Sequence, residues 1–356
     1  MSLKLHHLVR SVFLASGAYA ATLLPADAKD PLTSINLQLR PWTVVAQEKG
    51  FLKEEFDKIG ITDVNLIASG TAELIGAESA ALNNNSIAIA QRMVYPATVH
   101  KANGLDAVIV WLSEPSDKYR TPILARAGND EVNTLADLEG KNFGSSRVSC
   151  YFTSPFEALA KVGLPLDSRL KEGKVRYQSI DNPAATNAAL LSGAIDATAA
   201  HLAVNSAAAL YLSGEVKVIG RSPDDGVYVN GACRVSYFAM RDFVDEYPEA
   251  IHAFLVAHER SKAWIYDNID EAAEIIAEGT RVPVEIAKFQ ITDESTYEFM
   301  KGEPDAQAAR DNIVRFQDWY VEQGDDILAD RKLTSAQIHD FVDDRFFAGG
   351  QYSVYN

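Results

Sequence analysis

The stretch INLQLRPWTVVAQEKG, residues 35–50, decides the fold class because a strand leads directly into a helix. Apolar and polar residues alternate over 35–39, as expected for a strand. Pro41 then stands in the first turn and Gly50 just past the end of a helix predicted over 41–49. Strand and helix alternate in this way down the chain, which indicates an α/β fold built on parallel sheets flanked by helices.

Two such α/β blocks are predicted. Strands of the first block are expected over residues 35–39, 64–68, 87–90 and 107–112. Strands of the second block are expected over residues 122–126, 142–144, 175–180, 194–197 and 216–219. In the second block, Ser154-Pro155-Phe156-Glu157 has the pattern of a capping box and predicts a helix from there to Val162.

From Tyr247 onward the apolar residues recur at helical spacing, so the tail is predicted to be helical. Two α/β blocks with such a tail indicate two lobes joined by crossover strands, with the tail completing the first lobe. The expected boundaries are residues 29–117 plus 240–356 for lobe I and residues 118–239 for lobe II.

The N-terminus predicts export. Lys4 and Arg10 precede an apolar run over 12–24, and Ala26-Asp27-Ala28 forms a cleavage signal. Residues 1–28 are therefore expected to be a signal peptide cleaved near Ala28, which makes the protein periplasmic. The apolar run is shorter than the roughly 20 residues that span a bilayer.

Composition narrows the class of partner. The chain has 356 residues, a net charge of −16 and a pI near 4.9. Such an acidic surface repels phosphate backbones and anionic lipid, so we expect no nucleic-acid or membrane-surface partner. We expect no cofactor either, because the chain has no Walker loop, GxSxG motif or dinucleotide fingerprint.

Cysteine and histidine spacing predicts no metal site. There is no CxxC or HExxH motif, and the seven histidines are scattered. Cys150 and Cys233 could form a disulfide in an oxidising compartment, but two cysteines are too few to indicate a disulfide framework, so their pairing stays open. Cys150 has no histidine at motif spacing, so we predict a buried, inert thiol there and not a nucleophile.

Polar residues at the ends of strands form the candidate ligand site, because ligands of open parallel sheets bind where the strands end. The candidates are Arg40, Trp42, Ser69, Gly70, Thr71, Gln91, Arg92, Ser145, Ser146, Arg147 and His201. Guanidinium groups, hydroxyls and backbone N–H groups at helix starts bind the oxygens of anions, and a tryptophan offers an apolar wall. Each candidate also has a purely structural interpretation. An arginine can form an ion pair, Ser69-Gly70-Thr71 can be a turn, Trp42 can be a core residue, and His201 can be a buried structural histidine.

Four segments resemble the sulfonate, taurine and nitrate group of ABC-transporter substrate-binding proteins. They are PWTVVAQEKGFL (41–52), TLADLEGKNFG (134–144), LSGAIDA (191–197) and YPEAIHAFLVAHERSKAWIYDNIDEAA (247–273). They occur in the family's order over most of the mature chain. The resemblance implies a two-lobed type II periplasmic-binding-protein fold whose lobes close on a ligand without catalysis. Residues 198–203 depart from the family's aromatic-and-proline pattern, which leaves the organic part of the ligand open.

The function implied by the resemblance is capture of a small organic anion, with an alkanesulfonate or taurine-like compound first and a carboxylate next. The implied partners are the membrane permease and ATPase of an importer, and we expect a monomer. Two alternatives stay open. One is an enzyme on the same fold, such as a desulfinase, although Arg40-Pro41-Trp42 stands where such enzymes carry a nucleophilic cysteine. The other is a ligand receptor for a periplasmic sensor.

Overall fold

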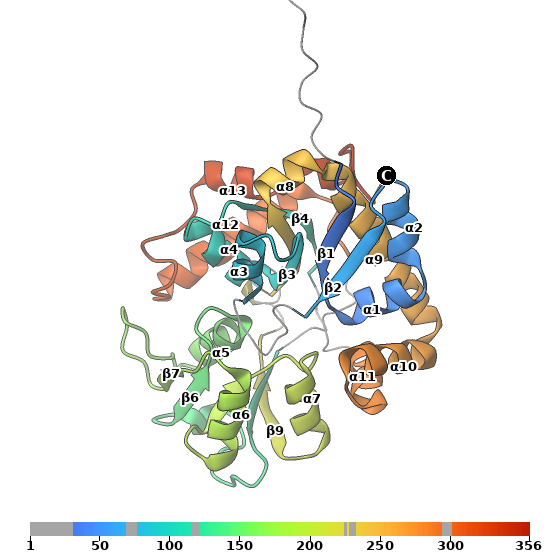
Figure 1. Ribbon diagram of the computed structural model, residues 1–356. Coiled ribbons are helices and arrows are strands. Elements are labelled where there is room, and N and C mark those ends of the chain that lie inside the picture. The colour runs from blue at the N-terminus through green and yellow to red at the C-terminus, as the bar shows by residue number, and fades with distance from the viewer. Residues whose placement is uncertain (1–30, 69–76, 116–120, 224–225, 228–232, 294–300) are drawn as a thin grey trace, which may run out of the picture. The chain divides into compact units, whose positions relative to one another are not determined.

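The computed structural model describes residues 31–68, 77–115, 121–223, 226–227, 233–293 and 301–356 (Figure 1). Residues 32–356 form one compact unit. The predicted signal peptide lies outside the described residues. The predicted lobe boundaries stay a prediction.

The first block contains two sheets. Strand β1 (Ser34–Gln38) pairs in parallel with β2 (Asp63–Ile67). In the second, three-stranded sheet, β10 (Val235–Met240) lies between β3 (Ile89–Met93) and β4 (Ala107–Leu112) and runs antiparallel to both. Strands β3 and β4 therefore point the same way, and β10 brings the chain back from the second block.

The second block is a five-stranded sheet, in the order β7 (Arg176–Ser179), β6 (Asn142–Ser145), β8 (Ala197–Ala199), β5 (Pro122–Arg126) and β9 (Val216–Arg221). Strand β6 pairs in parallel with β7 and β8, whereas β5 is antiparallel to β8 and β9. All of these strands except β5 thus share one direction, and together with the flanking helices they confirm the α/β class.

Helices separate the strands in both blocks. Those of the first block are α1 (Pro41–Glu48), α2 (Phe51–Asp57), α3 (Ala77–Asn83) and α4 (Val94–Ala102). Those of the second block are α5 (Cys150–Lys161), α6 (Pro183–Ser192) and α7 (Asn205–Leu212), with a 3₁₀ turn at Leu135–Leu138. Pro41 begins α1, and Gly50, at φ 77°, turns the chain into α2.

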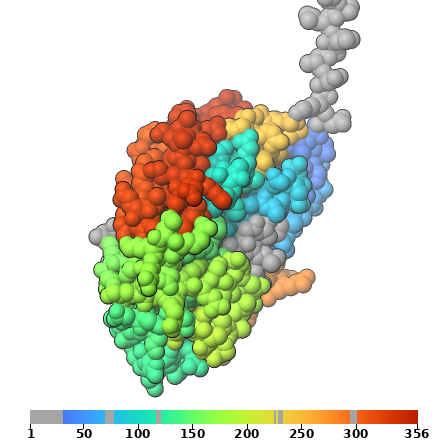
Figure 2. All heavy atoms as spheres, turned by 90° about the vertical axis from the view of Figure 1, so that its left-hand side faces the viewer, coloured from blue at the N-terminus to red at the C-terminus, as the bar shows by residue number. Residues whose placement is uncertain are grey.

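The tail from Tyr247 onward is helical, as predicted, and contains α9 (Pro248–Asp267), α10 (Ile269–Thr280), α11 (Val284–Thr292), α12 (Ala306–Glu322) and α13 (Ser335–Phe341), with a 3₁₀ turn at Asp344–Phe346. One further helix, α8 (Arg241–Glu246), precedes the predicted start. Helix α9 packs on α1 and α2, and α12 on α4, whereas α11 contacts α7 of the second block. Figure 2 shows the C-terminal residues, in red, next to the green second block, where Tyr320 donates to the carbonyl of Thr153 at 3.3 Å.

The predicted start of α5 is wrong. The helix begins at Cys150 with Ser149 as its N-cap, and the Ser149 hydroxyl accepts from the backbone N–H of Tyr151 at 3.1 Å. Ser154 and Pro155 lie inside the helix and are buried. Pro155 is the sixth residue of the helix and has no N–H to donate to the carbonyl of Tyr151, so α5 continues past it without that one hydrogen bond.

Apolar side chains of both blocks and the tail form one main core, which includes Trp42, Tyr95, Phe143, Phe238 and Phe316. Among the described residues, no helix combines the length and the apolar character that crossing a membrane would need.

Candidate functional site

Arg92, in β3, links the two blocks. Its guanidinium pairs with Glu78 of α3, and the two side chains are 12% and 2% exposed. Its Nη2 donates to the carbonyl of Val148, 3.3 Å away in the loop between β6 and α5. Nε of Arg92 and Oε2 of Glu78 have no hydrogen-bond partner among the described residues. Arg92 therefore brings a largely buried guanidinium with remaining donor capacity to the junction of the blocks.

Gln91 precedes Arg92 in the same strand and is buried. Its backbone N–H donates to Oε1 of Gln38 at 2.8 Å. Both polar atoms of its own side chain, Oε1 and Nε2, have no partner within the described part of the chain. A buried amide in this state costs about 1–3 kcal/mol, and contact with a bound ligand is one way to offset that cost. Gln91 is therefore a candidate for a polar contact with a ligand.

The serines of the second block shape the loop that faces Arg92. Ser145 ends β6, and both Ser145 and Ser146 are buried. The Ser146 hydroxyl donates to the carboxylate of Asp181 at 3.1 Å. The Ser149 hydroxyl donates to the carbonyl of Ser146 at 2.8 Å while it caps α5. These hydroxyls hold the loop in place, so a ligand here would meet its backbone as well as its side chains.

Arg147 lies in the same loop, and its charge is balanced within the protein. The guanidinium stacks over the rings of Phe152, 4.1 Å away, and Tyr177, and it pairs with Asp326. Asp326 also accepts from Nε of Arg169 at 2.8 Å. Burial raises the pKa of Asp326, but the hydrogen bonds from Arg147 and Arg169 outweigh burial and lower that pKa below its usual value. Arg147 thus joins the second block to the tail.

Arg40 and Trp42 lie at the start of α1. Arg40 is the N-cap residue, and its backbone N–H donates to the Thr43 hydroxyl at 2.7 Å. Trp42 is fully buried, and the Ser261 hydroxyl donates to its backbone carbonyl at 2.9 Å. Its ring packs edge-on against Tyr237, Phe254 and His258. The contacts of Trp42 are those of a core residue.

His201 follows β8 and is buried. Its Nδ1 lies 3.1 Å from the hydroxyl of Thr121, and its ring is 5.0 Å from that of Tyr151. Burial lowers the pKa of His201 to about 3, so the imidazole is neutral at physiological pH. The remaining predicted site residues, Ser69, Gly70 and Thr71, lie outside the described residues.

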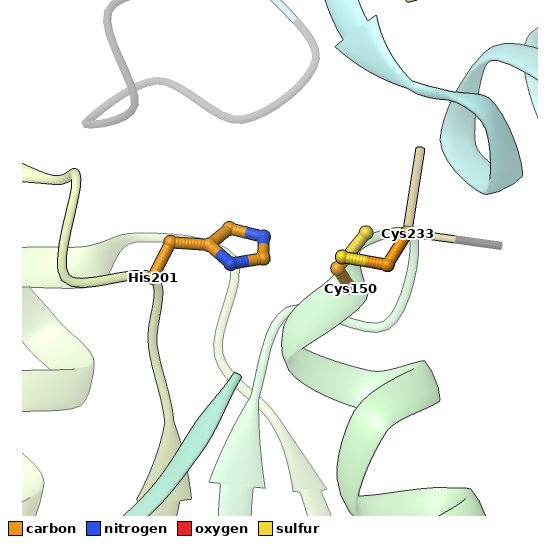
Figure 3. A group of neighbouring side chains, drawn as sticks. All are labelled: Cys150, His201 and Cys233. Atoms are coloured by element: carbon orange, nitrogen blue, oxygen red, sulfur yellow. The ribbon is translucent and has the colours of Figure 1, made fainter. Parts of the chain in front are cut away.

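Sequence reasoning missed one cluster. Cys150, His201 and Cys233 come together in the structure, with one donor atom of each within 4.8 Å of the others (Figure 3). The three residues are far apart in the sequence and follow no motif spacing, so the cluster could not be predicted from the sequence. One member of the cluster, Cys150, is two residues after Val148, whose carbonyl accepts from Arg92.

The arrangement suits recognition of a polar solute. It offers a partly satisfied guanidinium and an amide without a partner among the described residues, both within β3, and a helix start with ordered backbone N–H groups after β6. The structure brings Arg92 and the 145–149 loop together, whereas Arg147 pairs with Asp326 and Trp42 packs against Phe254.

Comparison with known proteins supports the fold. The alkanesulfonate-binding protein SsuA from Xanthomonas axonopodis pv. citri, bound to MOPS, superposes with a TM-score of 0.68 at 18% identity, covering 88% of this chain and 99% of that one. The periplasmic aliphatic sulphonate binding protein SsuA from Escherichia coli gives a TM-score of 0.66 at 19% identity, over 86% and 96% of the two chains. At these identities the likeness shows the fold alone.

A third similar structure is a DSZB mutant in complex with biphenyl-2-sulfinic acid, with a TM-score of 0.59 at 16% identity over 89% of this chain and 97% of that one. A search of curated protein sequences found no match. A family model described as NMT1/THI5 like matches residues 42–272, which is more than half of the chain. The chain therefore belongs to the NMT1/THI5-like family and has the fold of periplasmic binding proteins.

Proposed function

We propose that the protein is the extracytoplasmic solute-binding component of an ABC importer and captures a small organic anion between its two lobes. The observation that carries the proposal is the junction at Arg92. A largely buried guanidinium of β3 reaches the backbone of the 145–149 loop, and the preceding residue of the strand, Gln91, has a side-chain amide without a partner among the described residues. Arginine offers a planar set of donors that matches sulfonate and carboxylate oxygens.

The ligand class rests on chemistry and on fold relatives. Sulfonates come first and carboxylates second, because solved proteins of this fold are described as binding alkanesulfonates or aliphatic sulphonates. Lobe closure would follow from a higher affinity of the ligand for the closed form. The closed form would then dock on a membrane permease driven by an ATPase. A periplasmic location and a monomeric state complete the proposal.

A thermal-shift screen of sulfonates, carboxylates, nitrate and pyrimidines tests it. A ligand at 100 times its Kd adds about 2.7 kcal/mol to the stability of the folded protein. A stabilising sulfonate or carboxylate supports the proposal. Stabilisation by none of the anions, or by a pyrimidine alone, would contradict it.

An enzyme on the same fold is the second candidate, because a thiol and an imidazole lie close together at Cys150 and His201. Incubating the purified protein with the stabilising ligand, followed by mass spectrometry of the small molecules, separates the two. Product formation that disappears in Cys150→Ala would favour the enzyme, whereas unchanged ligand favours the binding protein. A receptor for a periplasmic sensor would bind the same ligand but engage a signalling partner in place of a permease.

A further inference from the structure

Three buried side chains converge in the cluster of Cys150, His201 and Cys233. The two Sγ atoms and one ring nitrogen lie within 4.8 Å of one another. The residues are 2%, 5% and 1% exposed. Figure 3 shows the His201 ring directed toward the two sulfur atoms. Two sulfurs and an imidazole nitrogen in one buried place are the donors that thiophilic metal ions prefer.

Ordered elements hold the two cysteines. Cys150 is the first residue of α5, directly after Ser149, whose hydroxyl caps the helix. Cys233 precedes Arg234, whose side chain is fully buried and pairs with Glu303 at 3.1 Å. This anchoring fixes the chain beside Cys233 at the start of β10. The donors therefore come from segments whose positions are set by packing.

Thr121 orients the histidine. Its hydroxyl lies 3.1 Å from Nδ1 of His201, and both side chains are buried. Metal-ligating histidines typically engage the second ring nitrogen in a hydrogen bond of this kind, which sets the tautomer and the ring orientation. With Nδ1 at Thr121, Nε2 is the nitrogen that would meet a metal.

We propose that Cys150, Cys233 and His201 form a binding site for one Zn²⁺, with the two thiolates and Nε2 as ligands and a fourth position for water or another small ligand. Two thiolates, a neutral imidazole and Zn²⁺ sum to zero charge, which suits a buried site. Zinc bonds of about 2.0–2.3 Å place tetrahedral donors roughly 3.3–3.8 Å apart. The three donors already lie within 4.8 Å of one another. The site goes beyond solute binding and does not depend on it.

Direct metal binding tests the site. The protein is reduced, freed of metal, kept anaerobic and titrated with Zn²⁺ against a chromophoric chelator. One equivalent is expected to bind. Titration with Co²⁺ is expected to give near-ultraviolet thiolate-to-cobalt absorption, which reports sulfur ligands without reference to any organic solute. Cys150→Ser and Cys233→Ser are each expected to halve that absorption or abolish it.

The variants distinguish residues that bind the zinc ion directly from residues that only lie beside the site. Loss of either cysteine is expected to weaken Zn²⁺ binding at least about 100-fold, and Thr121→Val, which keeps all three ligands, about 10-fold. His339→Gln, at an exposed histidine of α13, is the matched control and should bind like the parent. Far-ultraviolet circular dichroism confirms that each variant is folded.

Three results would overturn the zinc site. The first is a reduced parent protein with no Zn²⁺ binding tighter than micromolar, and the second is a Cys150→Ser variant that binds as tightly as the parent. The third is a protein isolated with a Cys150–Cys233 disulfide that, once reduced, shows no thiolate-to-cobalt absorption. The organic-anion screen plays no part in these readouts, so the site and the proposed function can fail separately.

Discussion

Arg147, in the loop after β6, pairs with Asp326, which lies 179 positions later in the sequence, beyond α12. Both side chains are largely buried, at 14% and 4% exposure. Asp326 accepts as well from the backbone N–H of Arg169 at 3.0 Å and from its Nε at 2.8 Å. One carboxylate of the tail therefore holds two arginines of the second block.

Replacing this carboxylate is expected to destabilise the protein. Asp326→Asn leaves Arg147 partly buried without a counter-charge, so the free energy of unfolding should fall by about 2–4 kcal/mol. Asp330→Asn, at an exposed neighbour, should change it by less than about 0.5 kcal/mol. Urea unfolding followed by circular dichroism measures both values. Equal, small effects of the two substitutions would mean that the pair contributes no net stability.

The same carboxylate predicts an acid dependence. Because the folded pKa of Asp326 lies below the ordinary 3.8, ionised Asp326 stabilises the folded state above about pH 3.8, and this stabilisation is lost as pH falls through the folded pKa. The stability gap between the parent and Asp326→Asn should therefore be full at pH 6 and shrink below about pH 3.8. Urea unfolding at a series of pH values measures it. A gap that stays constant down to pH 2.5 would contradict the assigned pKa shift.

Much of the order of strands and helices could be predicted from the sequence. Burial of one face of an element imposes a periodic pattern of apolar residues, and glycine and proline mark the ends of the helices. Thus β1, α1 and β4 fall where predicted, within one residue. The start of a helix could not be predicted where two residues were each suitable as its N-cap. Ser149 and Ser154 are both plausible caps by residue type, and only the packing of α5 decides for Ser149. Helices α2, α7 and α8 were not predicted, and length is not the reason, because α7 has 8 residues, as many as the predicted α1.

The candidate site was partly predictable. The predicted end of the third strand, at residue 90, pointed to Gln91 and Arg92, but β3 runs from Ile89 to Met93 and contains both. The hydrogen bond to Val148 places Arg92 at the junction of the blocks. The partners of the charges were not predictable, since Glu78 and Asp326 meet their arginines only through the tertiary fold. The Cys150 cluster depends on such long-range contacts as well.

Arg92→Lys tests the guanidinium. Lysine keeps the charge beside Glu78 but, as a point charge, cannot reach Glu78 and the Val148 carbonyl with one planar group. We expect the Kd of the best anion from the screen to rise at least about 10-fold, with a stability loss of only about 1 kcal/mol. Arg176→Lys, at an exposed arginine on β7, is the control. Calorimetric titration of the parent, Arg92→Lys and Arg176→Lys with that anion measures the three Kd values. An unchanged Kd in Arg92→Lys would show that Arg92 does not belong to the site.

Gln91→Met separates binding from stability. The Gln91 amide has no partner among the described residues, so an apolar side chain of similar shape removes an unsatisfied buried group. Without ligand, the variant should be as stable as the parent or more stable by up to about 1 kcal/mol. With ligand, it should lose the amide contact, and the Kd should rise about 10-fold or more.

Gln290→Met is the matched control for this exchange. Gln290 is equally buried, but its Nε2 donates to the carbonyl of Ala203 at 2.7 Å and to Oδ1 of Asn205 at 2.8 Å. Removing a satisfied amide should lower the stability by about 1–3 kcal/mol and leave the Kd unchanged. Thermal unfolding with and without the anion reads out both quantities. If Gln91→Met loses as much stability as Gln290→Met and binds like the parent, the amide of Gln91 serves the fold and not the ligand.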